Sequence, residues 1–312
     1  MKNIAVIVTY NRCALLKENL FMLEKQTKQL DKILIIDNCS NDGTQENVKE
    51  TFKNSKLNID YRYMKENYGG AGGFYYGVKY AVEEGADFIW LMDDDGRPFD
   101  KFTFERIYNE AINLYKNNNL IFLNSLVTYN GTDLSFGFDQ KIEKGKQLKN
   151  IEKEKNGNLL YNKVNPFNGT LISKELVEKI GYPRKEFFIS RDETDYMNRS
   201  KMAGATTATV MNSIYFHPES KLIFKKIFGY STQIYPNLDK EYYFIRNLTY
   251  SYKNSDKGKI YMFMFMRLLT ILFYEDNKMK RIKQVFEAKS DAYKNKMGKR
   301  KWYECFNNNE FN

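Results

Sequence analysis

The first hundred residues alternate between apolar runs of strand length and segments with helical spacing, and this alternation restricts the possible folds more than any other feature. The apolar runs have the composition of buried strands: "IAVIVTY" (4–10), "KILIID" (32–37) and "FIWLM" (88–92). Helical spacing is found in "CALLKENLFMLEKQ" (13–26), "QENVKETFKN" (45–54) and "YYGVKYAVEEGA" (75–86). This order predicts an α/β fold with a mainly parallel central sheet.

Each of the three predicted strands is followed by polar residues, at positions 9–12, 37–40 and 93–95. Because ligands of open α/β sheets bind outside the carboxyl ends of the strands, we expect these clusters to lie on one rim. "NYGGAGGF" (67–74) is predicted to be a glycine-rich turn, either a plain flexible loop or one that lets backbone approach a ligand. It is neither GxGxxG nor a P-loop, which argues against a dinucleotide-binding fold or an NTPase.

Composition limits the class of protein further. A length of 312 residues with 42% hydrophobic content can fill a sizeable core, so the chain is globular. The formal net charge of +10 favours phosphate-rich partners, which are nucleotides, nucleic acid or an anionic membrane surface. Nucleic acid is disfavoured because the lysines are spread along the chain and concentrated in its tail, rather than interleaved with aromatic residues.

The cysteines and the N-terminus carry no signal for export. Cys13, Cys39 and Cys305 lack the spacing of a disulfide framework or a thiolate metal site, which suits a reducing compartment. The first apolar run is too short for a secretory signal and lacks a small-residue cleavage site, so we predict that it is a strand.

Three consecutive aspartates follow the third strand. Strand alternation predicts Asp93 and Asp95 on one side and Asp94 on the other. Two carboxylates on one side can hold a divalent cation that also binds a diphosphate. His217, the single histidine, ends a later predicted strand and would complete an O,O,N set suited to Mn²⁺ or Mg²⁺. A solvated acidic turn and an incidental histidine are the alternatives.

A second acidic cluster, "RDETDY" (191–196), is predicted to begin a helix. Either Asp192 or Glu193 could act as a general base toward an attacking hydroxyl, with Arg191 or Arg199 keeping the neighbouring acids ionised. The alternative is an ordinary acidic helix start.

The rest of the chain is less regular. Residues 139–163 are rich in lysine and weakly patterned, which predicts an excursion or a mobile loop. From residue 221 the sequence is basic and aromatic, and residues 257–306 look helical throughout. The apolar run 260–274 is shorter than the roughly 20 residues of a membrane span. It could pack on the main domain, pair with another subunit, or lie at a bilayer interface.

Taken in order, these segments resemble the inverting glycosyltransferases of family 2, which have the GT-A fold. "VTYNR", "IIDNCSNDGT", "DDD" and "FFISRDETDYMNR" match the family's two nucleotide-binding loops, its metal motif and its base-bearing segment. A narrower resemblance is to the galactofuranosyltransferase branch, through the glycine segment, the triple aspartate, the later histidine, "NGTLISKELVEKIGYP" and "YYFIRN". Rhamnosyl- and other hexosyltransferases share many of these features.

The resemblance implies a role for each matching position. A UDP-sugar donor would be bound by Thr9, Asn11, Arg12, Asp37, Asn67, Gly69, Gly70, Asp93 and Asp94. Asp93, Asp95 and His217 would hold Mn²⁺ or Mg²⁺, and Glu193 is slightly preferred over Asp192 as the base. Residues 1–220 would form the GT-A domain and 221–312 a helical C-terminal extension.

The resemblance also implies the partners and the cellular location. The expected acceptor is a lipid-linked surface glycan, which would place the enzyme on the cytoplasmic face of the membrane, where anionic lipid attracts the basic extension. A homo-oligomer is a further expectation, and no nucleic-acid partner is expected. A catalytically inactive partner subunit is the remaining alternative, and the intact acids and His217 argue against it.

Overall fold

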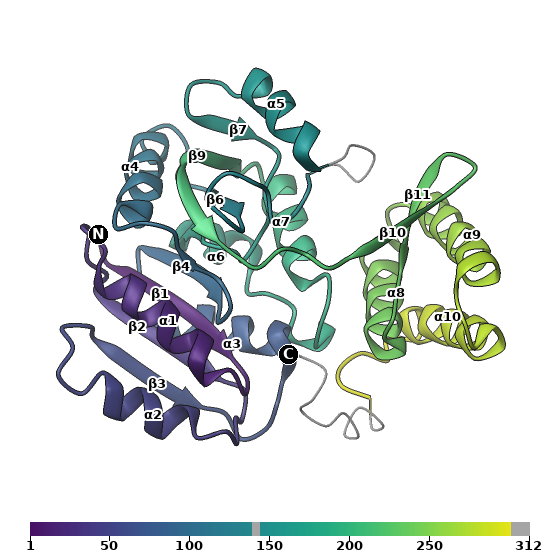
Figure 1. The fold of residues 1–312 in the computed structure, drawn as a ribbon, viewed down its shortest axis with the longest axis horizontal. Coiled ribbons are helices and arrows are strands. Elements are labelled where there is room, and N and C mark those ends of the chain that lie inside the picture. The colour runs from purple at the N-terminus through teal and green to yellow at the C-terminus, as the bar shows by residue number, and fades with distance from the viewer. Residues whose placement is uncertain (139–143, 301–312) are drawn as a thin grey trace.

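The computed structural model describes residues 1–138 and 144–300. The N-terminal half alternates strands and helices as predicted, in the order β1 (Asn3–Thr9), α1 (Cys13–Glu24), β2 (Lys32–Asp37), α2 (Thr44–Thr51), β3 (Ile59–Tyr63), α3 (Gly69–Glu83) and β4 (Phe88–Asp93). β1 pairs in parallel with both β2 and β4, and the register sets Thr9 opposite Asp37 and Val8 opposite Asp93. The carboxyl ends of these three strands therefore share one edge of the sheet (Figure 1).

The second half of the domain completes a mixed sheet. It contains β5 (Arg97–Pro98), α4 (Thr103–Tyr115), β6 (Ile121–Thr128), α5 (Lys144–Glu154), β7 (Leu159–Tyr161), β8 (Thr170–Ser173), α6 (Lys174–Ile180), the 3₁₀ helix η1 (Lys185–Phe187), α7 (Asp192–Met202) and β9 (Thr206–Phe216). The strand order is β3-β2-β1-β4-β8-β6-β9-β5, with β7 beside β9. β8 is antiparallel to both neighbours, whereas β3, β2, β1 and β4 are parallel. The predicted α/β fold is confirmed.

Apolar side chains cover both faces of this sheet. On one face, residues of α1, α2 and α4 pack around Trp90, whose ring centroid lies 4.8 Å from that of Phe104. On the other face, residues of α3, α6 and α7 pack around Phe74, 4.3 Å from Phe167. Strand side chains alternate between these two cores, which is why each strand reads as a continuous apolar run.

The glycine-rich turn predicted for residues 67–74 is mostly helical, because α3 begins at Gly69. The glycines allow this helix to lie close to the sheet. A Cβ atom on Gly73 would be 2.4 Å from Cγ1 of Val8, and one on Gly77 would be 2.2 Å from Cγ1 of Val6. These positions therefore require glycine for packing rather than for a turn.

The excursion predicted for residues 139–163 contains regular structure, namely α5 and β7. Ile151 and Leu160 are each 1% exposed and pack in a small core with Leu126, Leu134 and Met211. The few apolar residues of this lysine-rich segment are thus enough to dock it on β9. Residues 139–143 lie outside the described residues.

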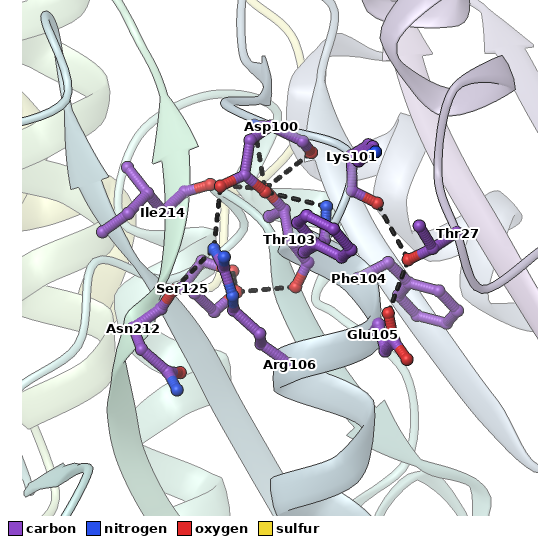
Figure 2. A network of polar contacts seen from close by, with 12 residues as sticks. Thr27, Asp100, Lys101, Thr103, Phe104, Glu105, Arg106, Ser125, Asn212 and Ile214 are labelled. Carbon is purple, nitrogen blue, oxygen red and sulfur yellow. Dashed lines mark hydrogen bonds and ion pairs between the residues drawn. The ribbon is translucent and has the colours of Figure 1, made fainter.

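A polar network holds the loop between β4 and α4 against β9 (Figure 2). Arg106 Nη1 donates to Asp100 Oδ2 (2.8 Å) and to the carbonyl of Asn212 in β9 (3.1 Å). Thr103 Oγ1 donates to the carbonyl of Ile214, also in β9 (2.9 Å). Because this loop contains Asp94 and Asp95 and β9 leads to His217, the network fixes the two segments relative to each other.

The C-terminal extension is helical as predicted, but it begins with a β-hairpin that was not expected. β10 (Ile223–Ile227) and β11 (Tyr230–Ile234) precede α8 (Leu238–Tyr252), α9 (Lys257–Tyr274) and α10 (Lys278–Tyr293), and all five elements lie to one side of the sheet (Figure 1). Phe228 and Gly229, at the hairpin turn, both have positive φ (47° and 83°), the backbone of a type I′ turn.

The helix predicted over 257–306 breaks between α9 and α10, where Asn277 has a φ of 47°, and residues 301–306 lie outside the described residues. Within α9, Arg267 interrupts the apolar run because it is buried against acids. Its Nε donates to Oε1 of Glu241 (2.7 Å), and Nη1 of Arg281 donates to Oε2 of the same carboxylate (2.6 Å). Removing one partner of such a buried pair costs about 3–5 kcal/mol.

Candidate active site

The rim of the sheet brings the three predicted polar clusters into contact. Thr9 Oγ1 donates to Oδ2 of Asp94 (2.8 Å), which joins the end of β1 to the residues after β4. The backbone N–H of Asn11 donates to Oγ of Ser40 (2.8 Å), and that of Asn38 donates to the carbonyl of Thr9 (2.9 Å), which joins β1 to β2. Parallel register therefore assembles one polar site from three segments.

Strand alternation does not separate the aspartates as predicted, because β4 ends at Asp93 and the next two residues form a turn. Arg12 contacts both of them. Its Nη1 lies 3.0 Å from Oδ1 of Asp94 and 2.7 Å from Oδ2 of Asp95. Arg12 was assigned to the donor site by resemblance, and the structure places its guanidinium directly on these acids.

His217 lies beside Asp95, with 3.3 Å between Nε2 and Oδ1. The other ring nitrogen, Nδ1, is 2.8 Å from the carbonyl of Pro218. β5, just after the aspartates, pairs with the end of β9 and sets Arg97 opposite Phe216. This short antiparallel pairing brings together residues more than a hundred positions apart in the chain.

The acids of this cluster carry unequal charge. Burial, followed by the charges of Asp95 and Asp94, raises the pKa of Asp93 to about 8. Burial also raises the pKa of Asp94 to about 6, against the attraction of Arg12. Burial opposes ionisation of Asp95, but the hydrogen bond and charge of His217, with the charge of Arg12, hold its pKa below the ordinary value. A cation placed here would relieve the repulsion that Asp93 experiences.

Among the residues that the structure describes, no three His, Cys, Asp or Glu side chains form a ready-made metal site. The donor set nevertheless fits a divalent cation, because two carboxylates and an imidazole suit Mn²⁺ or Mg²⁺. The buried hydroxyl of Tyr215 has no hydrogen-bond partner among the described residues. It lies within electrostatic range of the same aspartates. Buried acids under mutual repulsion and an unsatisfied hydroxyl both favour an added cation.

Asp37, assigned by resemblance to the donor site, is fully buried at the end of β2. Its Oδ1 accepts from the backbone N–H of Ser40 (2.8 Å), and its Oδ2 accepts from the hydroxyl of Tyr61. Tyr61 comes from β3 and was not predicted as a site residue. No local motif marks it, since its role depends on the parallel pairing of β2 with β3.

The start of α3 lies next to this rim. Asn67 Oδ1 accepts from the backbone N–H of Gly69 (2.7 Å), whose own carbonyl accepts from Nδ2 of Asn38 (3.1 Å). Gly69 has a φ of +70°, which glycine adopts without strain. A Cβ on Gly70 would meet no atom within 4 Å, so this residue faces open space. The glycine segment thus leaves space at Gly70 that a side chain would fill, close to the end of β2.

The second acidic cluster begins α7 as predicted. Asp192 is 5% exposed and Glu193 is half-buried. Burial, then the charge of Glu193 and a hydrogen bond with it, raise the pKa of Asp192 well above the ordinary value. The charge of Asp93 contributes in the same direction, so the two acidic clusters lie within electrostatic range of each other.

Two arginines near this cluster pair with its third acid, Asp195. Arg199 Nε donates to Oδ2 of Asp195 (2.8 Å), and Arg184 Nε donates to the same oxygen (3.2 Å). Asp195 is therefore a structural carboxylate. The guanidinium of Arg191 lies over the ring of Phe244 in α8, 5.1 Å from its centroid.

Comparison with known proteins identifies the family. The family model described as "Glycosyl transferase family 2" matches residues 4–181, more than half of the chain. The chain belongs to glycosyl transferase family 2. The matched range contains the rim and the start of α3, whereas α7 and His217 lie beyond it.

This family 2 glycosyltransferase also resembles individual proteins. It is 29% identical over 255 residues to Galactofuranosyltransferase GlfT1 of Mycolicibacterium smegmatis, which covers 79% of this chain and 81% of that protein. The predicted resemblance to galactofuranosyltransferases is thereby confirmed.

Solved structures show the same fold. TarS 1-349 of S. aureus in complex with UDP-GlcNAc superposes with a TM-score of 0.60 at 16% identity, covering 94% of this chain and 81% of that chain. The chain spans 49% of the longer TarS chain. The mannosyltransferase PcManGT of Pyrobaculum calidifontis, in complex with GDP-Man and Mn²⁺, gives 0.55 at 14% identity, covering 94% of this chain and 75% of that chain. The predicted GT-A fold class is confirmed.

Proposed function

We propose that this enzyme is a metal-dependent, inverting glycosyltransferase that moves galactofuranose from UDP-galactofuranose to a hydroxyl of a lipid-linked surface glycan. One observation carries the choice of sugar, namely the similarity to a named galactofuranosyltransferase over 79% of the chain. The complexes of TarS with UDP-GlcNAc and of PcManGT with GDP-Man and Mn²⁺ support a nucleotide-sugar donor and a divalent metal.

In this proposal the residues of the rim bind the donor. Its nucleotide and diphosphate would be surrounded by Thr9, Asn11, Arg12, Asp37, Asn67, Gly69, Gly70, Asp93 and Asp94. Asp93, Asp95 and His217 would hold Mn²⁺ or Mg²⁺, which when bound stabilises negative charge on the leaving diphosphate. Arg12 already contacts two of the aspartates, and its charge favours their ionised forms.

The acids at the start of α7 supply the base. A hydroxyl oxygen of the acceptor attacks the anomeric carbon opposite the diphosphate, and the bond from that carbon to the phosphate oxygen breaks as the new bond forms. The hydroxyl proton passes to a carboxylate. We assign this role to Glu193, because its half-buried side chain is accessible to an acceptor, whereas Asp192 is buried. Asp192 is the second candidate, since its raised pKa suits a base that works near neutral pH.

The test is UDP release from UDP-galactofuranose and from UDP-galactopyranose, each with Mn²⁺ and with chelator. We expect metal-dependent turnover of the furanose donor alone. Turnover of the pyranose donor, or of a rhamnose donor in a wider panel, would replace galactofuranose while leaving the enzyme class unchanged. Turnover that persists in the presence of chelator would contradict the proposed metal dependence.

Two non-enzyme alternatives make different predictions. A nucleic-acid-binding protein would bind oligonucleotides without metal and with strong salt dependence. An inactive partner subunit would bind UDP but turn over no donor. Membership of family 2 and the presence of both acidic clusters favour the proposal that the protein is an active enzyme.

The C-terminal extension, residues 221–312, is proposed to contact the membrane that carries the acceptor. α9 has an exposed apolar stripe formed by Tyr261, Met262, Phe265, Leu272 and Phe273, which are 49–64% exposed. α9 contains no acidic residue, and exposed lysines lie at its start and along α10. Apolar and basic side chains together suit an anionic lipid surface.

No helix in the described part of the chain is both long enough and apolar enough to cross a bilayer. Docking through the α9 stripe would therefore be peripheral, and we propose that it occurs on the cytoplasmic face. A second copy of the chain is the other occupant that this stripe could take.

A further inference from the structure

The chain that leads into α7 has a constrained backbone. Phe188, Ser190 and Arg191 all have positive φ, between 65° and 68°, although none is glycine. Such residues cost about 1–3 kcal/mol each and persist only where the surroundings fix them. The segment 186–191 must therefore be held from outside.

α8 holds this segment with the side-chain amide of Asn247. Its Nδ2 donates to the carbonyls of Phe187 (3.0 Å), Ile189 (3.0 Å) and Ser190 (2.8 Å). Asn247 is fully buried, so water cannot replace these bonds. One amide group thus fixes three of the carbonyls in the irregular segment.

The neighbouring residue, Arg246, holds the same segment from the same helix. It is 1% exposed, and its Nη2 lies 3.0 Å from the carbonyl of Phe187 and 3.3 Å from that of Glu186. Its Nη1 donates to the carbonyl of Gly298 (2.7 Å), which ties in the chain after α10. The buried guanidinium of Arg246 therefore links Gly298, which follows α10, to the segment that precedes α7.

The opposite side of the segment touches the start of α3. The carbonyl of Phe188 accepts from the backbone N–H of Ala71 (3.1 Å), and a Cβ on Gly69 would lie 2.0 Å from that oxygen. The ring of Phe188 packs on Tyr243 of α8, with 5.2 Å between centroids. Segment 186–191 is thus held between the glycine segment and α8.

We infer that Arg246 and Asn247 are positioning residues, which hold segment 186–191 and thereby set the carboxylates of Asp192 and Glu193 against a donor bound beside α3. The inference rests on the proposed function, which gives those two acids their role. It also assigns a task to the C-terminal extension within the reaction itself: α8 supports the base although neither residue contacts the reacting atoms.

The experiment compares four variants of the full chain. Asn247→Asp removes the amide donors at nearly constant size, and Arg246→Lys removes the guanidinium fork that reaches three carbonyls. Arg267→Lys is the matched control, because Arg267 is an equally buried arginine of the same helical unit whose described bonds go to Glu241, Glu275 and the carbonyl of Gln233. Since a buried carboxylate can prevent folding, Asn247→Ala is prepared as well.

The measured quantities are kcat and KM for Mn²⁺-dependent UDP release from UDP-galactofuranose, UDP affinity by calorimetry, Tm, and hydrogen exchange of residues 186–191. We expect kcat to fall about 10²-fold in Asn247→Asp or Asn247→Ala, the loss that a displacement near 1 Å produces. KM and UDP affinity should stay unchanged, and exchange should increase in the segment. The Arg246→Lys variant should show a similar decrease in kcat, whereas the Arg267→Lys variant should have a lower Tm but an unchanged kcat.

Wild-type kcat in both Asn247 variants, or an equal loss in Arg267→Lys, would overturn the inference. Failure of the proposed base is distinguishable, because it would appear as wild-type kcat in both Asp192→Asn and Glu193→Gln.

Discussion

Carboxylates of the same kind behave differently in this site because their surroundings differ. Asp93 is buried beside two acids, which raises its pKa to about 8, whereas Asp95 is stabilised as an anion by His217 and Arg12. The acid that is harder to ionise is the one that a cation would help most.

Asp95→Ala should therefore abolish metal-dependent donor binding while leaving the fold intact. The substitution removes one proposed metal ligand and the partner of both Arg12 and His217. UDP binding is measured by calorimetry with and without Mn²⁺, and circular dichroism checks the fold. Glu50→Ala, which removes an exposed carboxylate of α2, should bind like the wild type. Retained Mn²⁺-dependent turnover in Asp95→Ala would reject the metal assignment.

The base should show a characteristic pH dependence. Burial, followed by the charge of Glu193, raises the pKa of Asp192 well above the ordinary aspartate value of about 3.9. Because a base acts only when deprotonated, kcat should be full above the raised pKa and lost as the pH falls through it. Asp192→Asn removes the carboxyl group whose pKa is raised, and should therefore remove this loss of kcat at acid pH.

Glu193→Gln should lose about 10²–10⁴-fold in kcat at every pH, the usual contribution of general-base catalysis. Both variants are measured by UDP release over a pH series with Mn²⁺ held constant. An unchanged midpoint in Asp192→Asn would show that the loss of kcat at acid pH does not come from Asp192. A larger loss of kcat in Asp192→Asn than in Glu193→Gln would identify Asp192, rather than Glu193, as the base.

At the scale of helices and strands, α3 shows how a sequence pattern can have two causes. Its glycines are needed where the helix touches β1, and only its first residue, Gly69, has a positive φ. We expect Gly77→Ala to destabilise the protein by about 1–3 kcal/mol through overpacking. Gly70→Ala, where a Cβ meets open space, is the matched control and should leave stability unchanged or slightly higher. Urea denaturation measures both, and equal stabilities would contradict the packing explanation.

The elements that the sequence predicts well are those with strong periodicity. The strands at 3–9, 32–37 and 88–93 and the helix that starts at Asp192 follow from apolar runs and helix-start chemistry. The hairpin at 223–234 was missed because β10 is mostly exposed, β11 is mostly half-buried, and only Phe228–Gly229 marks the turn. No local sequence signal predicts the hydrogen bonds from Asn247 to segment 186–191 either, because the donor and its acceptors are 57 to 60 residues apart.

At the scale of the whole molecule, the extension is expected to join two tasks, support of the base through α8 and membrane contact through α9. Phe265→Gln with Phe273→Gln should reduce flotation with anionic liposomes, because both side chains are more than half exposed on the apolar stripe. Met202→Gln, which removes an exposed apolar residue of α7, is the control. Unchanged flotation would argue against lipid docking, and a change from dimer to monomer in solution would instead identify a second copy as the occupant.

The proposed mechanism makes one overall demand, which is that attack and departure occur on opposite sides of the anomeric carbon. The most direct test is the configuration of the first-formed sugar, read by proton NMR during Mn²⁺-dependent turnover of UDP-galactofuranose with water as acceptor, before the free sugar equilibrates. Inversion relative to the donor is the predicted result. Retention of configuration would contradict a single in-line displacement assisted by Glu193 or Asp192.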